Sequence, residues 1–358
     1  MAPVIVGTGL IAMDLVLRGE EKLPVRRCAG GTCGNVLASL AYLGWKAVPV
    51  ARLANDRAGE VVKKDLEAWG VDTRFLGIPS TKPTPIVIQR LLDGPGGEPI
   101  HKFSWTCPCC GSWLPRYTAV AKPAGAQVVA DVRAPQVFFF DRPSPAAIAM
   151  AATYAEVGAL VVFEPSANGD PRAFDAALKL ADVVKYSDQR MAALPQYLPK
   201  RKQLEIQTLG RAGLRYRFVK GSRTTAWKLL PAVSARQLVD SAGAGDWSTA
   251  GLLHHVGRAG RAGFESCESG DLEAALHYGQ ALAAWTCSYE GARGGMYERT
   301  VRQFRKDVAT LIDGSKQGKA IVQLTPQNGE LTGICPSCAK TPRKRRASRP
   351  ARQIRSVA

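Results

Sequence analysis

Hydrophobic positions along the chain alternate between two spacings, and this alternation predicts strands separated by helices. Short β-branched or apolar runs bounded by glycine or polar residues predict strands at 4–6, 47–53, 137–140, 160–163, 183–184 and 204–208. Apolar residues at helical spacing predict helices at 35–43, 59–69, 144–157, 171–180, 245–256 and 271–289. Strands joined by helices of this length form βαβ units, so we expect an α/β fold with a mainly parallel sheet.

Two further pairs of segments predict antiparallel hairpins. Residues 84–92 and 99–105 flank a glycine-rich turn at 93–97, and we expect this pair to form a lid. Residues 215–219 and 224–229 predict a hairpin at the edge of the main sheet.

Composition agrees with a folded domain. The chain has 358 residues, of which 46% are hydrophobic and 22% are charged, so it is long and apolar enough to bury a large core. The N-terminal apolar stretch lacks a cationic start and is interrupted by Gly7, Gly9 and Asp14, which argues against a secretory signal. No apolar run is long enough to span a bilayer. We therefore expect a cytoplasmic protein with no membrane partner.

Positive charge is in excess and is concentrated at the C-terminus. The formal net charge is +18, and residues 340–355 contain eight Lys or Arg and no acid, which leaves +10 for the rest. Residues 341–358 are too basic and too poor in apolar side chains to form a core, so we expect a disordered basic tail. A basic surface attracts polyanions, and nucleic acid is a candidate partner for this tail.

A stretch of small residues at 239–251 carries the clearest chemistry. It contains Asp240-Ser-Ala-Gly-Ala-Gly-Asp246, follows a strand-like segment and opens a predicted helix. Amides at a helix N-terminus, approached closely because the side chains are small, stabilise a developing phosphate charge. A carboxylate in the first helical turn can accept a proton from a substrate hydroxyl. We expect Asp246 to be a catalytic base and Gly243, Ala244 and Gly245 to form the anion hole.

This stretch resembles the most diagnostic motif of the ribokinase-like (PfkB) carbohydrate and nucleoside kinases. Further matches follow in the same order, with Gly30-Gly31-x-x-x-Asn35 similar to the family's substrate loop and 208–213 similar to its nucleotide-binding stretch. The resemblance implies a three-layer α/β/α fold over residues 1–312, with a small β lid from about 11–30 and 82–105. It also implies ATP and Mg²⁺ as cofactors, with a monovalent cation as a further candidate.

The resemblance assigns site residues position by position. The acceptor-binding positions it implies are Asp14, Gly30, Gly31 and Asn35. Carboxylate and amide side chains suit the reading of sugar hydroxyls. The ATP-binding positions it implies are Ser187, Thr208, Gly210 and Gly213. At the family's Asn-x-x-Glu element for Mg²⁺ this chain has Ser187 and Arg190, and Glu164 replaces a usual Asp, so metal placement departs from the family pattern.

Two other nucleotide-binding motifs are alternatives, and neither describes this sequence. Gly7-Thr-Gly9-Leu-Ile-Ala12 matches a dinucleotide-binding pattern, but the following residues, 13–27, predict a poor helix. The chain contains no Gly-x-x-x-x-Gly-Lys-Ser/Thr sequence, which excludes a P-loop kinase.

Two Cys-Pro-x-Cys units predict a structural metal site. They contribute Cys107, Cys110, Cys335 and Cys338, with Cys109 as a spare thiol. Four thiolates suit tetrahedral Zn²⁺. We expect residues 105–118 and 330–340 to form a zinc-binding element, although two separate turns with free thiols remain the alternative.

Together these observations predict an ATP-dependent kinase that phosphorylates a hydroxyl of a sugar or nucleoside-like acceptor. The alternative is a nucleic-acid-associated binding protein, with a zinc ribbon and a basic tail on a degenerate kinase fold. A homodimer is a further expectation, because relatives often pair through the lid.

Overall fold

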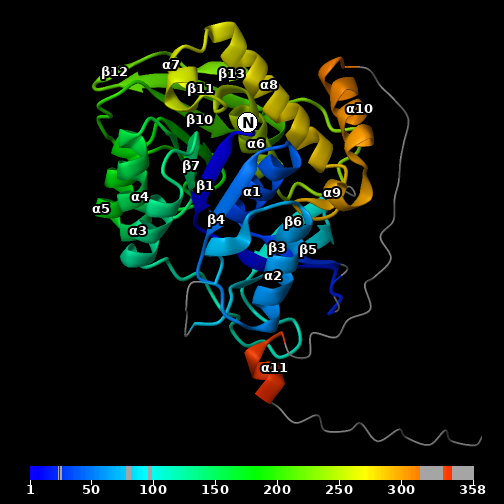
Figure 1. Cartoon of the computed structure of the whole chain (residues 1–358). Helices are drawn as coiled ribbons and strands as arrows, with labels where there is room; N and C mark the ends of the chain where they lie inside the picture. Colours follow the sequence, from blue (N-terminus) through cyan, green and yellow to red (C-terminus); the bar gives the residue numbers. More distant parts are fainter. Residues whose placement is uncertain (23, 25, 78–81, 96–98, 315–333, 341–358) are drawn as a thin grey trace, which may run out of the picture.

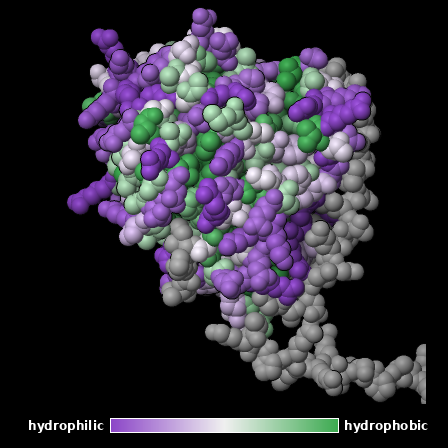
Figure 2. All heavy atoms as spheres, in the orientation of Figure 1, coloured by the Kyte–Doolittle hydropathy of each residue, from purple (hydrophilic) through white to green (hydrophobic). Residues whose placement is uncertain are grey.

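The computed structural model of the chain describes residues 1–22, 24, 26–77, 82–95, 99–314 and 334–340. The predicted basic tail, 341–358, and residues 330–333 of the predicted zinc element lie outside the described residues. Within the described part, no helix combines the length and the apolar character needed to cross a bilayer. Hydrophobic side chains on the face in Figure 2 are scattered among hydrophilic ones.

A large sheet forms the centre of the fold (Figure 1). Six parallel strands lie in the order β10 (Gln203–Thr208), β9 (Val183–Ser187), β8 (Leu160–Phe163), β7 (Val137–Phe140), β1 (Val4–Thr8) and β4 (Lys46–Val50). The antiparallel strand β11 (Leu214–Lys220) continues the sheet beyond β10 and pairs with β12 (Arg223–Thr224) and β13 (Lys228–Leu230). The predicted parallel sheet and its antiparallel edge hairpin are thus confirmed.

Helices cover both faces of this sheet because the buried strands are apolar on both sides. On one face α4 (Pro145–Glu156) and α5 (Pro171–Leu180) pack against Phe138, Phe140 and Phe163, with α3 (Lys122–Asp131) beside α4. On the other face α1 (Thr32–Tyr42), α6 (Ala244–Val256) and α8 (Ser269–Thr286) share a core with Ile5 and Phe139. The architecture is the expected three-layer α/β/α fold.

A second sheet of four strands lies beside the first and forms the β lid. Its order is β3 (Arg26–Gly30), β2 (Ala12–Arg18), β5 (Ile86–Asp93) and β6 (Pro99–Ser104). Strands β5 and β6 pair in antiparallel register, as the glycine-rich turn predicts, whereas β2 and β5 are parallel. Helix α2 (Arg57–Ala68) packs against β2 and β3, and the 3-10 helix η1 (Thr73–Phe75) follows it.

Some elements carry no clear signal in the sequence. Strand β2 is buried along nearly its whole length, so the polar and apolar alternation of a half-exposed strand is missing. Because β2 follows Gly9, the strand-turn-helix arrangement of a dinucleotide-binding motif does not form. Several helices were also not predicted, namely η1, α3, η3 (Gly210–Ala212), α7 (Gly260–Glu265), α9 (Gly294–Glu298), α10 (Val301–Ile312) and α11 (Pro336–Lys340).

Candidate active site

Asp246 lies in the first turn of α6, at the carboxyl edge of the parallel sheet. The helix begins after Gly243, whose φ of 74° lies in the left-handed region. A Cβ at Gly243 would lie 2.4 Å from the carbonyl oxygen of Ala292, so only glycine fits this entrance. The first turn of a helix leaves amides without intrahelical partners, and these carry the positive end of the helix dipole. The local geometry therefore suits an anion.

Asn35 joins Asp246 to the predicted substrate loop. Its Nδ2 donates a hydrogen bond of 2.7 Å to Asp246 Oδ2, across 211 residues of sequence. On its other side Asn35 Oδ1 accepts a hydrogen bond of 3.2 Å from Nε of the buried Arg293. Arg293 also donates through Nη2 to the carbonyl of Ala29 and to Asp65 Oδ2. The two predicted motifs thus meet through Asn35, which is held from its other side by Arg293, a residue that the sequence did not single out.

Asp14 lies on β2 and is 2% exposed. Its Oδ2 accepts a hydrogen bond from Gln89 Nε2 on β5, and its Oδ1 has no partner among the described residues. A Cβ at Gly30 would lie 1.8 Å from Asp14 Oδ2, which explains the need for glycine at this point of β3. One buried oxygen of the Asp14 carboxyl group therefore remains available to a ligand hydroxyl, as an acceptor when the group is ionised and as a donor when it is protonated.

Burial raises the pKa of both carboxyl groups. The pKa of Asp246 is raised to about 7, by loss of water contact and by the nearby Glu164 charge, against the hydrogen bond from Asn35 and the cations Lys185 and Arg190. The pKa of Asp14 is raised to about 8, mainly by burial, although Arg293 opposes this. A carboxyl group whose pKa lies near neutrality is suited to general-base catalysis.

A buried ion pair supports the start of α6. Lys185 Nζ lies 2.6 Å from Glu164 Oε1 and donates a hydrogen bond of 3.1 Å to the carbonyl of Gly245. Thr249 Oγ1 donates to Glu164 Oε2 at 2.6 Å. Both Glu164 oxygens are thus engaged within the protein. The Lys185 ammonium group thus lies next to the predicted anion hole, and no sequence motif indicated a role for it.

The predicted ATP-binding residues lie at the ends of neighbouring strands. Ser187 ends β9 and Thr208 ends β10, and these two residues are paired in the parallel register. Gly210 and Gly213 enclose the 3-10 helix η3 that follows Thr208. A Cβ at Gly213 would lie 2.2 Å from the carbonyl oxygen of Leu230. The structure therefore brings all four residues to one edge of the sheet.

The metal-placing positions depart from the family pattern in the structure as well. Ser187 Oγ accepts a hydrogen bond from the amide of Gln189, and the Arg190 charge acts on Asp246. Neither residue supplies a carboxylate for Mg²⁺, although the exposed Asp188 lies between them. Mg²⁺ commonly keeps several water ligands and binds through substrate phosphates. These residues fit an ion carried by the nucleotide better than one held by the protein.

Sequence comparison agrees with this geometry. Residues 173–299, which include the Asp246 motif and the 208–213 stretch, match the sequence profile of the pfkB family carbohydrate kinase. An ATP-dependent ribose-1-phosphate kinase from Halopiger xanaduensis is 27% identical over 319 residues, covering 84% of this chain and 97% of that protein. The chain thus resembles the pfkB family of carbohydrate kinases.

Solved structures share the fold of this chain. The fructokinase from Xylella fastidiosa with bound ATP superimposes with a TM-score of 0.64 at 20% identity, over 87% of this chain and 98% of that one. A nucleoside kinase from Burkholderia thailandensis in complex with inosine gives a TM-score of 0.61 at 17% identity, over 88% and 100%. The match to the pfkB carbohydrate kinases and the ribose-1-phosphate kinase relative together indicate a phosphotransferase with an alcohol group as acceptor.

A histidine of the lid also contacts the glycine motif. His101 on β6 lies with Nδ1 2.8 Å from Asp240 Oδ1. Asp240 is fully buried and accepts hydrogen bonds from the amides of Ala242, at 2.9 Å, and Gly291, at 2.8 Å. Asp240 therefore holds the glycine loop in place and ties it to the lid, a contact that no sequence pattern indicated.

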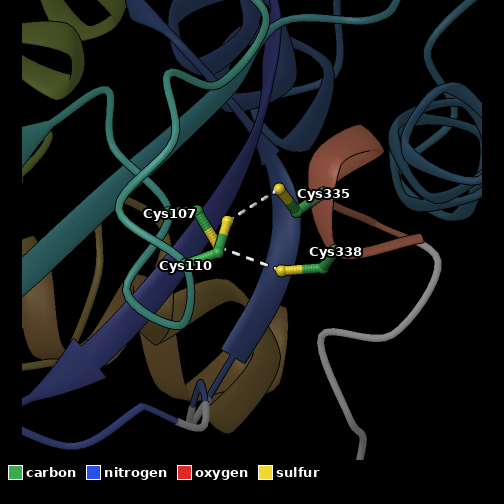
Figure 3. A group of neighbouring side chains, drawn as sticks. All are labelled: Cys107, Cys110, Cys335 and Cys338. Carbon is green, nitrogen blue, oxygen red and sulfur yellow. Dashed lines mark hydrogen bonds between the residues drawn. The ribbon is translucent and has the colours of Figure 1, made fainter. Parts of the chain in front are cut away.

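The predicted metal-binding cysteines form a cluster of their own. Cys107, Cys110, Cys335 and Cys338 form one cluster whose sulfur atoms all lie within 4.8 Å of one another (Figure 3). Cys109 is exposed and does not belong to the cluster. The structure thus brings together the four cysteines that the two Cys-Pro-x-Cys units contribute.

Proposed function

We propose that this kinase transfers the γ-phosphoryl group of ATP to a hydroxyl of a sugar or nucleoside-like acceptor, with Asp246 as the base. The observation that carries the proposal is the 2.7 Å hydrogen bond between Asn35 and Asp246. It places a residue suited to sugar hydroxyls next to the candidate base, at the glycine-lined entrance of α6. An acceptor held by Asp14 and Asn35 would present its hydroxyl to Asp246.

Each part of the site has a role in the proposed transfer. Asp246 accepts the hydroxyl proton, and the backbone amides of 243–245 stabilise the transferred group. Ser187, Thr208, Gly210 and Gly213 hold the nucleotide, and Lys185 adds positive charge beside the anion hole. Mg²⁺, when bound with ATP, neutralises phosphate charge. The lid sheet covers the acceptor side, where it excludes water that would otherwise compete as the phosphoryl acceptor.

The similarity to the ribose-1-phosphate kinase suggests which acceptors to test first. Because that protein is a ribose-1-phosphate kinase and matches this chain along nearly its full length, a phosphorylated pentose is the preferred acceptor. Unphosphorylated sugars and nucleosides follow. The nucleic-acid alternative depends on charge and on the tail at 341–358, and no described contact favours it.

ATP consumption in the presence of single acceptors tests the proposal. The purified protein is assayed with ribose-1-phosphate, ribose, fructose, inosine and an oligonucleotide, with Asp246→Asn as control. We expect one small acceptor to stimulate ATP consumption, and the variant to lower kcat by about 10²- to 10⁴-fold while ATP binding persists. Normal turnover by Asp246→Asn would contradict the assignment of the base. Stimulation by the oligonucleotide alone would favour the alternative.

A further inference from the structure

Four cysteine sulfurs converge at one point between two segments that are distant in the sequence (Figure 3). Cys107 Sγ lies 3.7 Å from Cys338 Sγ, and Cys110 Sγ lies 3.8 Å from Cys335 Sγ. These separations are far longer than the S–S bond of about 2.05 Å in a disulfide. A tetrahedron of sulfurs around Zn²⁺, with Zn–S distances near 2.3 Å, has edges of about 3.8 Å.

We propose that Cys107, Cys110, Cys335 and Cys338 bind one Zn²⁺ as thiolates, and that this ion fixes residues 105–118 against the acceptor-binding strands. Four protein ligands leave no open position, so the ion has a structural role. Each thiol releases its proton to solvent as the metal binds, and no oxidation or reduction is involved.

The backbone around the first pair is folded into a tight turn. The amide of Cys107 donates a hydrogen bond of 2.8 Å to the carbonyl of Ser112, and the amide of Gly111 donates one of 2.9 Å to the carbonyl of Cys107. Gly111 has a φ of 72°, a conformation that favours glycine. A bridge between Thr106 and Trp113 closes the turn. These contacts hold Cys107 and Cys110 on the same side, facing the second pair.

The second pair is anchored in the same core as the lid. Ile334 and Cys335 are 5% and 2% exposed, and they belong to the hydrophobic cluster that also contains Cys107 and Leu114. Cys338 follows in the short helix α11. The C-terminal segment is therefore packed onto the turn at 107–111.

The turn is continuous with the walls of the acceptor site. The carbonyl of Pro115 accepts a hydrogen bond of 3.0 Å from the amide of Ile86, at the start of β5. Trp105 and Tyr117 pack against Leu10, Ala12 and Val87, next to Asp14 on β2. Loss of the metal would free this segment and, through it, disturb the strands that carry Asp14 and Gln89. This second half of the inference rests on the proposed function, whereas metal binding does not.

Metal content of the full-length protein tests the site. Protein purified without chelator is analysed by inductively coupled plasma mass spectrometry, beside Cys335→Ser/Cys338→Ser and the matched control Cys109→Ser, which alters an exposed neighbouring thiol. We expect about one zinc per chain in the native protein and in the control, and loss of most of it in the double variant. Absence of stoichiometric zinc from the native protein, iron in its place, or full zinc in the double variant would overturn the site.

A second measurement needs no variant. Native protein depleted of zinc with a chelator and refilled with Co²⁺ should gain the absorption bands of tetrahedral thiolate coordination. Octahedral bands, or no bands, would refute the proposed geometry.

Steady-state kinetics then test whether the metal site influences the acceptor site. Zinc-depleted enzyme should show kcat/KM for the acceptor lowered by about tenfold or more, with KM for ATP nearly unchanged. Equal effects on both substrates, or none, would reject the positioning role while leaving the metal site intact.

Discussion

Arg293 Nε donates a hydrogen bond of 3.2 Å to Asn35 Oδ1, and this contact decides which way the Asn35 amide faces. With its oxygen bound to a guanidinium, Asn35 presents Nδ2 to Asp246. Arg293 is itself 2% exposed and held by Asp65 and the carbonyl of Ala29. We infer that Arg293 is a positioning residue, which acts on the candidate base through Asn35.

Arg293→Gln should therefore lower kcat/KM for the acceptor by about 10²-fold, because a mispositioned base reacts poorly. It should also move the acid limb of the pH profile to higher pH, because the Asn35 hydrogen bond lowers the pKa of Asp246 and would weaken. Steady-state kinetics across pH measure both effects. Arg299→Gln is the control, since Arg299 pairs with Asp307 away from the site. A loss of activity with an unmoved profile would argue for a merely structural role.

The raised pKa of Asp246 predicts the pH dependence of the reaction. A base must be ionised, and its pKa is about 7, so log kcat should fall as the pH drops below about 7, with a slope of about one. Above that pH the carboxylate is fully available and this limb should level off. Measurement of kcat at saturating ATP and acceptor between pH 5 and 9 checks the prediction, and a flat profile down to pH 5 would contradict it.

Removing the charged side chains beside Asp246 should shift the acid limb of the pH profile in opposite directions. Glu164 raises the pKa of Asp246 and Arg190 lowers it. Glu164→Gln should thus shift the acid limb to lower pH, and Arg190→Gln should shift it to higher pH. The two substitutions act as controls for each other, since each removes one charge near the same carboxyl group. Shifts in the same direction would show that the limb belongs to another group.

The contact between His101 and Asp240 predicts that the lid and the glycine loop are coupled. His101→Leu removes the partner of a fully buried carboxylate, at a cost of about 1–3 kcal/mol in unfolding free energy, and should lower kcat on the order of tenfold. Thermal unfolding and steady-state kinetics measure these effects. The matched control is His277→Leu, at an exposed position of α8. Unchanged kcat in His101→Leu would mean that Asp240 holds the loop without the lid.

Local patterns in the sequence were enough for the fold class. Strands such as 137–140 and 160–163 were predicted with their observed bounds, because short apolar runs between turn residues have few alternatives. The glycine motif indicated a phosphate site for a similar reason, since a helix entrance lined by small residues is a local feature. The Cys-Pro-x-Cys spacing likewise named the four cysteines that come together.

Contacts between distant segments were decided only by the tertiary structure. Arg293, Lys185 and His101 stand in no recognisable motif, and each gains its role from a partner at least 21 residues away in sequence. The raised pKa values of Asp14 and Asp246 arise from burial and from neighbouring charges, which exist only once the sheets and helices have packed. The sequence by itself determined the fold class and named candidate site residues, whereas packing determined their surroundings, because burial and electrostatic interaction depend on distance in space rather than along the chain.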